Sequence, residues 1–394
     1  MKKIKLASNT ISNTDYKVLI KFLQKRSYLN QSKVTRTFES RFSKIIGKKY
    51  SIFVNSGSSA NLLIAQTLLE GKNLKNKTVV VPSVSWSTTV SPFVQLGYNV
   101  VICDSNSSNL GLDIEHLSKL CKKYKPGLVV AVNVLGHSND FRKIQSLKKK
   151  FNFYLVEDNC ESLGSKYKNK SLGSIGFASS HSFYFGHHIS TIEGGMVSTD
   201  DYKFYNIALS IRAHGWARDL QKKIKNKLEK KYNITPFESF YKFYYQGFNI
   251  RSTDLNATLG INQLKKLNSI CKIRYRNYLM YKKFLPNFWF QKSDLKLISS
   301  FGYSTFVKNR EEVYKILAKN NIESRPIICG NIAKQPFMKD KYLNSKDNFS
   351  NANFVDKYGI YLPNHANLSI QDIDLVTKKF LKIAKPIFFK RNYV

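Results

Sequence analysis

The strongest constraint on the fold is an alternation of short apolar runs with amphipathic segments through residues 1–200. The runs are rich in valine and isoleucine, and the segments between them, such as 60–69 and 114–124, have helical spacing. Nearly continuous apolar strands that alternate with helices are typical of a sheet buried on both faces. The sequence therefore predicts an α/β fold with a mostly parallel central sheet. We expect strands at residues 78–82, 100–104, 128–134, 153–158, 179–184 and 196–199.

The pattern changes after Asn249, where helical spacing becomes longer and strands become sparse. We therefore predict a large domain, residues 1–254, which includes the N-terminal segment, and a smaller C-terminal α/β domain, residues 255–394. In the smaller domain we expect one long or kinked helix, a strand and two further helices, at residues 254–284, 297–307, 310–320 and 370–384.

The chain is strongly basic, with 64 Lys and Arg against 26 Asp and Glu and a formal net charge of +38. A nucleic-acid surface is one interpretation of such a charge. Because the lysines are spread along the whole chain, solvated positions explain them better, and we expect no nucleic-acid partner. The charge would still attract anionic ligands. The basic stretch 218–243 predicts either a mobile excursion or a solvated helix.

Several features indicate the compartment. No apolar run approaches the roughly 20 residues that span a bilayer, and the start, MKKIKLASNTISN, lacks the apolar core of a secretory signal. The five cysteines are scattered and form no CxxC pair, which fits a reducing compartment and argues against a disulfide framework. We expect a cytoplasmic protein without a membrane partner.

The segment VNSGSSANLL, residues 54–63, has the pattern of a strand end, a Ser/Gly turn and a helix start. Gly57 lets the backbone approach a ligand closely, and Ser58 and Ser59 offer hydroxyl groups and N-cap chemistry. Free N–H groups at a helix start favour phosphate. Such turns are common before helices, so the pattern alone is a weak indication of a phosphate site.

Two further segments place polar and aromatic groups near strand ends. Asp158, in LVEDNCESLG, follows a buried strand, where it could pair with a cationic ring nitrogen or merely cap the next helix. Trp86, in VPSVSWSTT, could stack on a flat cofactor or lie in the core. With the turn at Gly57, these residues match a pyridoxal-phosphate site, because a carboxylate keeps that ring protonated as an electron sink.

On these motifs the chain resembles the fold-type-I, aspartate-aminotransferase-like sugar aminotransferases of the DegT/DnrJ/StrS type. In that family a segment S-F-x-x-x-K…E-G-G supplies the lysine that holds the cofactor covalently. Here the segment reads SFYFGHHISTIEGG, and counting back eight positions from Gly195 lands on His187. Residues 171–202 contain no lysine.

The resemblance therefore narrows to the branch that replaces this lysine with histidine and dehydrates sugars at C3. It implies pyridoxal 5'-phosphate and pyridoxamine 5'-phosphate as cofactors and His187 as the catalytic proton carrier, since histidine shuttles protons near neutral pH. A related branch also carries a two-iron two-sulfur cluster on four cysteines. This chain has only Cys271 and Cys329 in its C-terminal third, so we expect no iron–sulfur cluster.

The same resemblance implies the other site residues and partners. Cofactor-binding roles fall to Glu161, Ser182 and Asn249, with Asn249 reaching the site of a neighbouring subunit in a homodimer that shares its active sites. Substrate-binding roles fall to His214 and Arg218, although an ordinary charged surface loop is the alternative for both. The implied substrates are a nucleotide-linked 4-keto-6-deoxy sugar, first of all a GDP-linked one, and L-glutamate, which re-aminates the cofactor.

Alternatives remain for the histidines and for the whole chain. His181, His187 and His188 could be metal ligands, but no HExxH spacing supports this, and we expect no metal. His188 is better explained as a structural neighbour of His187. The competing functions are a sugar aminotransferase, which the absent lysine disfavours, and a non-catalytic basic binding protein on the same fold.

Overall fold

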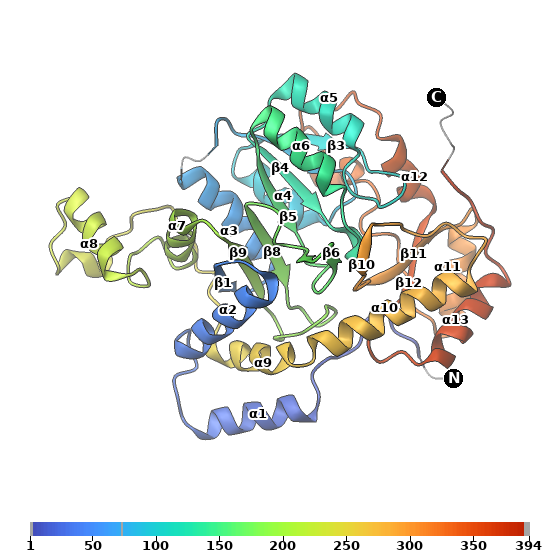
Figure 1. Cartoon of the computed structure of the whole chain (residues 1–394), viewed down its shortest axis with the longest axis horizontal. Coiled ribbons are helices and arrows are strands. Elements are labelled where there is room, and N and C mark those ends of the chain that lie inside the picture. The colour runs from blue at the N-terminus through green and yellow to red at the C-terminus, as the bar shows by residue number, and fades with distance from the viewer. Residues whose placement is uncertain (1–2, 72–73, 390–394) are drawn as a thin grey trace.

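A seven-stranded sheet forms the centre of the molecule in the computed structural model, which describes residues 3–71 and 74–389 (Figure 1). Strand β9 pairs antiparallel with both of its neighbours, and every other neighbouring pair in this sheet is parallel. The predicted mostly parallel α/β sheet is therefore confirmed. In spatial order its strands are β1 (Tyr50–Val54), β9 (Gly195–Thr199), β8 (Ala178–Ser182), β5 (Tyr154–Asp158), β4 (Leu128–Val132), β2 (Thr78–Pro82) and β3 (Asn99–Cys103).

Helices cover both faces of this sheet. Successive residues of a strand point to opposite faces, and because strands such as β4 are apolar throughout, both faces have to be buried. In β2, Val79 and Val81 belong to one hydrophobic core, while Val80 belongs to another. The first core also contains residues of α3 (Gly57–Glu70), α4 (Ser87–Gln95) and α7 (Tyr202–Arg212), and the second contains residues of α5 (Ile114–Tyr124) and α6 (Phe141–Phe151).

Two of the predicted strands end earlier than expected. β4 stops at Val132 because the chain enters a short 3-10 turn, η1 (Val134–Gly136), in which Leu135 has a left-handed backbone with φ of 50°. β8 stops at Ser182, and the next two residues lead the chain into the loop that carries the paired histidines. Both strand ends therefore give way to loops at the same edge of the sheet.

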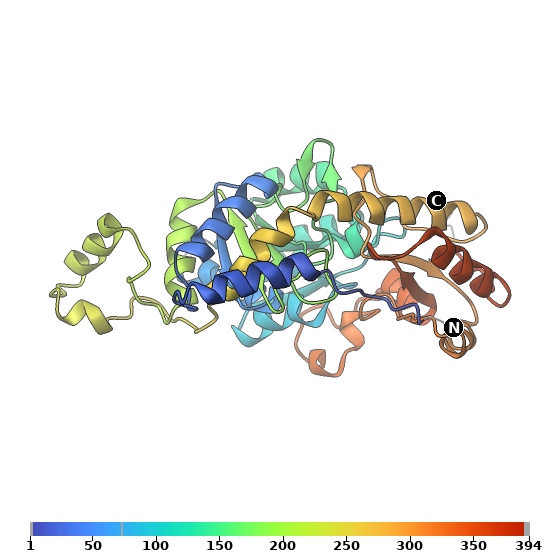
Figure 2. The same ribbon diagram turned by 90° about the horizontal axis from the view of Figure 1, so that it is seen from below.

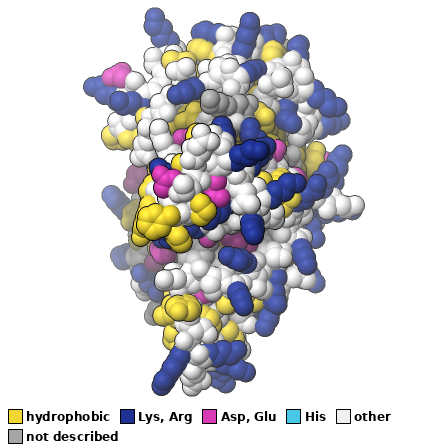
Figure 3. Space-filling model, turned by 90° about the vertical axis from the view of Figure 1, so that its left-hand side faces the viewer, with side chains coloured by type: hydrophobic (Ala, Val, Ile, Leu, Met, Phe, Trp, Pro, Cys, Tyr) yellow, Lys and Arg dark blue, Asp and Glu magenta, His cyan; other side chains and the backbone are white. Residues whose placement is uncertain are grey.

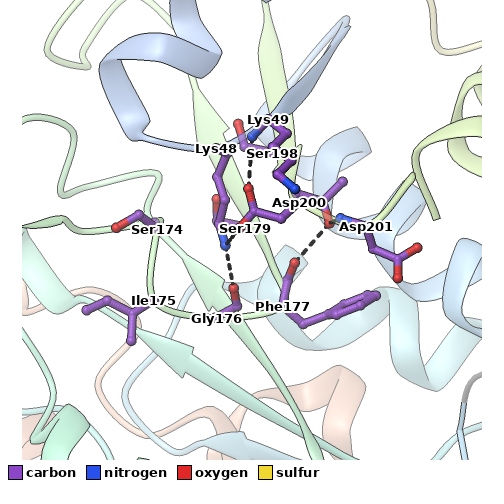
Figure 4. A network of polar contacts seen from close by, with 12 residues as sticks. Lys48, Lys49, Ser174, Ile175, Gly176, Phe177, Ser179, Ser198, Asp200 and Asp201 are labelled. Atoms are coloured by element: carbon purple, nitrogen blue, oxygen red, sulfur yellow. Dashed lines mark hydrogen bonds and ion pairs between the residues drawn. The ribbon is translucent and has the colours of Figure 1, made fainter. Parts of the chain in front are cut away.

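The turn before β8 is fastened to two other elements by a buried lysine (Figure 4). Lys48 Nζ donates to the Gly176 carbonyl at 2.8 Å and pairs with Asp200 Oδ2 at 2.9 Å. On the adjacent strand, the buried carboxylate of Glu157 accepts from the N–H groups of Gly173 and Ile175 at 2.8 and 2.7 Å. These contacts fix the start of β8, the strand whose other end carries Ser182.

The C-terminal part begins with two helices that meet at a kink, α9 (Asp254–Leu264) and α10 (Leu267–Phe284), which confirms the kinked alternative. The single strand expected at 297–307 is confirmed only in its second half, because the chain passes between two separate sheets there. β10 (Leu295–Leu297) pairs with β6 (Lys166–Tyr167), whereas β11 (Gly302–Phe306) pairs with β12 (Gly359–Pro363). The remaining elements of this part are α11 (Arg310–Lys319), η3 (Ile332–Lys334), η4 (Pro336–Met338), α12 (Ser350–Tyr358) and α13 (Ile370–Leu381).

Both ends of the described chain lie on the side of the small part, at some distance from each other (Figure 1). Ile4 forms a parallel bridge with Ile322, and its side chain is buried in the hydrophobic core that also holds Tyr278 and Phe380. Helix α9, in contrast, packs against α1 (Asn13–Gln24) and α2 (Lys33–Ile46). The division of the chain after residue 254 stays a prediction.

The basic stretch 218–243 contains a helix, α8 (Lys222–Lys231), none of whose residues is buried. Figures 1 and 2 show it projecting from the end of the molecule opposite the small part. The solvated-helix alternative is therefore confirmed. Figure 3 views this end and shows Lys and Arg side chains distributed over the whole height of the face. Across residues 3–71 and 74–389, no helix combines the length and apolar character that a membrane crossing needs.

Candidate active site

A cavity of about 850 Å³ opens at the carboxyl ends of the central strands. The lining from the central sheet and the loops that follow its strands, here called the sheet wall, includes Ser56, Gly57, Ser58, Asn61, Trp86, Asp158, Cys160, Glu161, Ser182 and His187. The lining from the N-terminal segment and the C-terminal part, here called the opposite wall, includes Lys3, Lys5, Leu6, Ala7, Phe301, Glu323, Arg325, Pro326, Ile328 and Tyr361. Ligands of open α/β sheets bind at this edge.

Gly57 and Ser58 are the first two residues of helix α3. The N-cap is Ser56, whose Oγ accepts from the Ser59 N–H at 3.0 Å, so the cap role expected of Ser58 and Ser59 is wrong because the helix begins at Gly57. The N–H groups of Gly57 and Ser58 have no acceptor within the helix and lie at the positive end of its dipole. A Cβ at position 57 would lie 2.7 Å from Ser182 Cβ, so only glycine allows the start of α3 to pack this closely against the end of β8.

Asp158 ends β5 as a fixed negative charge in the floor of the cavity. Its Oδ2 accepts from Asn61 Nδ2 at 2.9 Å and from Thr89 Oγ1 at 2.8 Å, and its Oδ1 accepts from the Cys160 N–H at 3.1 Å. Three donors hold the carboxylate in one orientation. Residues 160–163 form a turn rather than a helix, so Asp158 is no helix cap.

Glu161 lies one turn further along the same wall. Burial raises the pKa of Glu161 to about 8, the negative charge of Asp158 adds to the rise, and a hydrogen bond from the Leu135 N–H at 2.9 Å opposes it. The carboxyl group is therefore protonated near neutral pH and can donate a hydrogen bond. Two neighbouring acids with different protonation states are a common arrangement in active sites.

His187 faces the cavity between two aromatic rings. Its ring centroid lies 5.2 Å from that of Phe301 and 6.3 Å from that of Tyr184, and its Nδ1 is buried without a hydrogen-bond partner. Burial, together with the positive charge of Arg274, lowers the pKa of His187 to about 3. The imidazole is therefore neutral at physiological pH and able to accept a proton.

The other two histidines of this region point elsewhere. His188 is fully buried, and its Nε2 donates to the Ser299 carbonyl at 2.8 Å. His181 lies inside the sheet within 3.2 Å of Ser179 Oγ. Within the described ranges, no group of three or more His, Cys, Asp or Glu side chains is arranged to hold a metal ion.

Ser182 and Trp86 complete the sheet wall. Ser182 is the last residue of β8, and its Oγ lies 3.2 Å from the position that a Cβ on Gly57 would take. Trp86 precedes helix α4 and is 58% exposed, so it is not a core residue. An exposed indole on a cavity rim can stack on a flat ligand.

The sequence analysis assigned no role to any residue of the opposite wall. Arg325 lies opposite Tyr361 in an antiparallel bridge, and both side chains reach the cavity. Phe301 is held by Arg274, a buried guanidinium that donates to the Phe301 carbonyl at 3.1 Å. These contacts join segments far apart in the chain, and no local motif marks them.

Three residues expected at the site lie outside the cavity of their own chain. His214 Nε2 lies 3.4 Å from an Arg251 nitrogen, and the Arg251 Nε donates to Asn249 Oδ1 at 3.1 Å. The Arg218 guanidinium lies 4.0 Å from the centroid of the Trp216 ring and donates to the Phe240 carbonyl at 2.5 Å. They form a separate polar and aromatic cluster beside the arm that carries α8.

The cysteines do not assemble into a cluster. Cys103, Cys121 and Cys271 are buried free thiols, and Cys160 and Cys329 are partly buried free thiols. Cys160 lines the cavity, where burial and the charge of Asp158 keep its pKa well above the ordinary value. It is therefore a neutral thiol rather than a nucleophile.

Comparison with known proteins gives one consistent result. Residues 9–381 match the model of the DegT/DnrJ/EryC1/StrS aminotransferase family. The GDP-4-keto-6-deoxy-D-mannose 3-dehydratase of Yersinia pseudotuberculosis is 35% identical over 372 residues, which cover 91% of this chain and 93% of that protein.

Solved structures of GDP-4-keto-6-deoxymannose-3-dehydratase share the whole architecture. One is a histidine-to-asparagine mutant with bound GDP-perosamine, and another holds a trapped PLP-glutamate geminal diamine. Each has a TM-score of 0.88 and 32% sequence identity, and the match covers 96% of this chain and 100% of the other.

Proposed function

The chain belongs to the DegT/DnrJ/EryC1/StrS aminotransferase family, as its motifs predicted, and from this premise we propose a C3 dehydratase of nucleotide-linked 4-keto-6-deoxy sugars. The observation that carries the proposal is a cavity lined by the Gly57 turn, Asp158 and Trp86 together with His187, which stands where the family has its lysine. The names of the most similar proteins support the same reaction and a GDP-linked substrate.

The residues of the sheet wall fit pyridoxal and pyridoxamine phosphate. The free N–H groups of Gly57 and Ser58, at the start of helix α3, suit a phosphate. The ionised Asp158 suits a protonated ring nitrogen, and Trp86 suits the ring face. When bound, the cofactor supplies an amine that reacts with the C4 ketone and a ring that accepts electrons as a proton leaves its methylene carbon.

We assign to His187 the role of the base that accepts this proton. Its neutral imidazole can accept the proton, and a bound phosphate ligand would favour the charged form by partly offsetting the burial and Arg274 that lower the pKa. It cannot replace the missing lysine as a covalent tether. Changing His187→Asn should slow turnover by about 10²–10⁴-fold, because a general base is lost.

The protonated Glu161 is placed to orient a polar group of the bound ligands. Its carboxyl lies on the same wall as Asp158 and keeps one donor hydrogen near neutral pH. In the overall reaction, the 4-keto-6-deoxy sugar and glutamate give a 4-keto-3,6-dideoxy sugar, 2-oxoglutarate and ammonia. The two electrons that reduce C3 therefore come from glutamate.

A direct assay separates this function from its alternatives. Purified protein with pyridoxal phosphate, L-glutamate and GDP-linked 4-keto-6-deoxymannose should release ammonia and a sugar that lacks the C3 hydroxyl. An aminotransferase would instead give a 4-amino sugar without ammonia, and a non-catalytic binding protein would give no product. The CDP-linked sugar in a parallel reaction identifies the preferred nucleotide.

The wild-type protein allows a test of whether any lysine in the cavity binds the cofactor covalently. Lys3 and Lys5 line the opposite wall and are the lysines of the described chain that reach the cavity. Borohydride treatment of the wild-type protein with pyridoxal phosphate should give no covalent adduct. An adduct on either lysine would overturn the assignment of an untethered cofactor.

We further propose a homodimer in which each subunit completes the other's site. His214, Arg218 and Asn249 lie outside their own cavity, beside strongly exposed aromatic side chains such as Phe237 and Tyr241. If Asn249 acts in the partner's site, mixing inactive His187→Asn and Asn249→Ala proteins under subunit exchange should restore activity. No restoration, or a fully active monomer in sedimentation, contradicts the shared site.

We also propose that the protein acts in the cytoplasm. Its five cysteines are free thiols, which a reducing compartment maintains. Cell fractionation with an activity assay tests this location.

A further inference from the structure

Two exposed cations that line the cavity, Lys5 and Arg325, form no ion pair with a carboxylate of the described residues. We propose that Lys5 and Arg325 form a subsite that binds an oxyanion of a substrate, either a carboxylate of glutamate or a phosphate of the nucleotide sugar. This proposal rests on the function proposed above and names the residues that would hold the exchangeable substrates.

The position of Arg325 follows from strand pairing. Its N–H donates to the Tyr361 carbonyl at 3.3 Å, and the Tyr361 N–H donates to the Arg325 carbonyl at 2.9 Å. Residues directly opposite each other in such a pair place their side chains on one face, here the face that lines the cavity. The guanidinium itself makes only one hydrogen bond in the described structure, to the neighbouring Ser324 carbonyl at 3.2 Å.

The position of Lys5 follows from the alternation of an extended segment. Ile4 is buried in the core of the small part, so Lys3 and Lys5 point to the other side and line the cavity. The segment is fixed by backbone bonds from Ile4 to Asn321 at 2.8 Å and from Glu323 to Ile4 at 2.9 Å. The Lys5 side chain is therefore held at the cavity by its backbone.

The nearest acid is already engaged. Glu323 Oε1 pairs with Lys3 Nζ at 3.1 Å, and its Oε2 accepts from the Leu6 N–H at 3.1 Å. Among the described residues, no carboxylate lies within ion-pair distance of Lys5 or Arg325. The positive charge of Arg325 helps to lower the pKa of Glu323, but it forms no ion pair with that carboxylate. An anion that enters the cavity would therefore stabilise these cations, and a guanidinium matches carboxylate and phosphate geometry.

The phosphate of the cofactor is not the anion in question. Its cradle at Gly57 and Ser58 belongs to the sheet wall, whereas Lys5 and Arg325 belong to the opposite wall. The two substrates that enter in turn both carry oxyanions. The subsite can therefore serve glutamate, the nucleotide sugar, or each of them in its own half-reaction.

The test uses the full-length holoenzyme with Lys5→Gln, Arg325→Gln and, as a matched control, Lys319→Gln. Lys319 is an exposed lysine on α11 outside the cavity, so its loss removes one charge from the overall field only. Half-saturating concentrations are measured separately for L-glutamate, from the spectrum of the cofactor, and for GDP-linked 4-keto-6-deoxymannose, from single-turnover product formation.

We expect roughly 10- to 100-fold higher half-saturation in the Lys5 and Arg325 variants, because a charge-assisted hydrogen bond is lost, with the limiting rate nearly unchanged. The control should match the wild type. An effect on glutamate alone assigns the carboxylate, an effect on the nucleotide sugar alone assigns the phosphate, and an effect on both assigns shared use. Wild-type values for both substrates in both variants overturn the subsite.

Calorimetric titration with L-glutamate and with unreactive GDP-mannose keeps the test independent of turnover. If the wild-type protein performs neither half-reaction, the proposed function fails, and the titrations still decide the subsite. Equal affinities of the wild type and both variants for both probes, or no binding by the wild type, contradict it.

Discussion

The two walls of the cavity are built in different ways. Residues of the sheet wall, such as Gly57, Asp158 and Ser182, lie at or just beyond the ends of strands of one rigid sheet, and their neighbours in sequence fix their positions. Residues of the opposite wall, such as Lys5 and Arg325, come from segments more than 300 positions apart that meet through a few backbone bonds. One wall is local in sequence and the other is assembled by tertiary contacts.

The walls also differ in how their polar groups are satisfied. Asp158 is buried and accepts three hydrogen bonds from the protein, whereas Arg325 and Lys5 are exposed and leave most of their donors free. A fully bonded group is pre-organised for a constant ligand. This difference is consistent with the proposal that the sheet wall binds a resident cofactor and that the opposite wall binds substrates that exchange.

After the loss of the His187 base, the largest expected effect is that of Asp158→Asn, which tests the constant role of the sheet wall. Turnover should fall roughly 10²–10³-fold, because a buried charge that loses its partner costs about 3–5 kcal/mol. Both half-reactions should slow, since both need the ring as an electron sink. The measurement is single-turnover kinetics of each half-reaction, with circular dichroism to show that the variant is folded. A loss confined to one substrate would erase the distinction between the walls.

Gly57→Ala should disturb the cofactor end by crowding. The new Cβ would lie 2.7 Å from Ser182 Cβ and 2.9 Å from Cys160 Sγ, and overpacking of this kind costs about 1–3 kcal/mol. We expect a lower free energy of unfolding in urea and weaker binding of pyridoxal phosphate by fluorescence titration. Unchanged stability together with unchanged cofactor affinity would show that Ser182 and Cys160 leave more space around position 57 than the structure indicates.

Glu161→Gln should change how stability depends on pH. The pKa of Glu161 is about 8 in the folded protein against an ordinary value of 4.5, so the folded chain keeps a proton that the unfolded chain loses between these values. The stability that this group confers is full below about pH 4.5 and is lost as pH rises toward 8. Each pKa unit corresponds to about 1.4 kcal/mol between the two protonation states.

Urea unfolding of the cofactor-free protein at pH 5 and pH 8 measures this effect. The wild type should lose more stability between the two pH values than Glu161→Gln does. Glu115→Gln, which alters an exposed carboxylate on α5, is the control and should behave like the wild type. Equal losses in the wild type and in Glu161→Gln would mean that Glu161 is ionised in the folded protein.

Trp86→Ala should have the smallest effect, because Trp86 lies on the rim between the walls. Loss of aromatic stacking is worth about 0.5–1.5 kcal/mol, which corresponds to a roughly 2- to 10-fold weaker binding of pyridoxal phosphate. Equilibrium titration of the cofactor measures the change. A weaker affinity for the substrates with unchanged cofactor affinity would reassign Trp86 to the opposite wall.

The contrast between the walls also sets what the sequence alone could predict. The Gly57 turn and Asp158 stand in short motifs at strand ends that apolar runs locate, whereas the role of His187 was predicted from the resemblance to a family that has a lysine at this place. The role of Lys5 depends on a bridge between Ile4 and Ile322, and no local pattern encodes such a pairing. The strand expected at 297–307 was confirmed only in its second half for the same reason, because β10 and β11 join different distant partners.

The most direct test of the account asks which histidine faces the cofactor. His187→Lys and His188→Lys proteins are loaded with pyridoxal phosphate, reduced with borohydride and analysed by peptide mass spectrometry. The account predicts a cofactor adduct on the introduced lysine at position 187 and none at position 188, because His187 lines the cavity and His188 is buried against the Ser299 carbonyl. An adduct at position 188, or at neither position in folded protein, would contradict it.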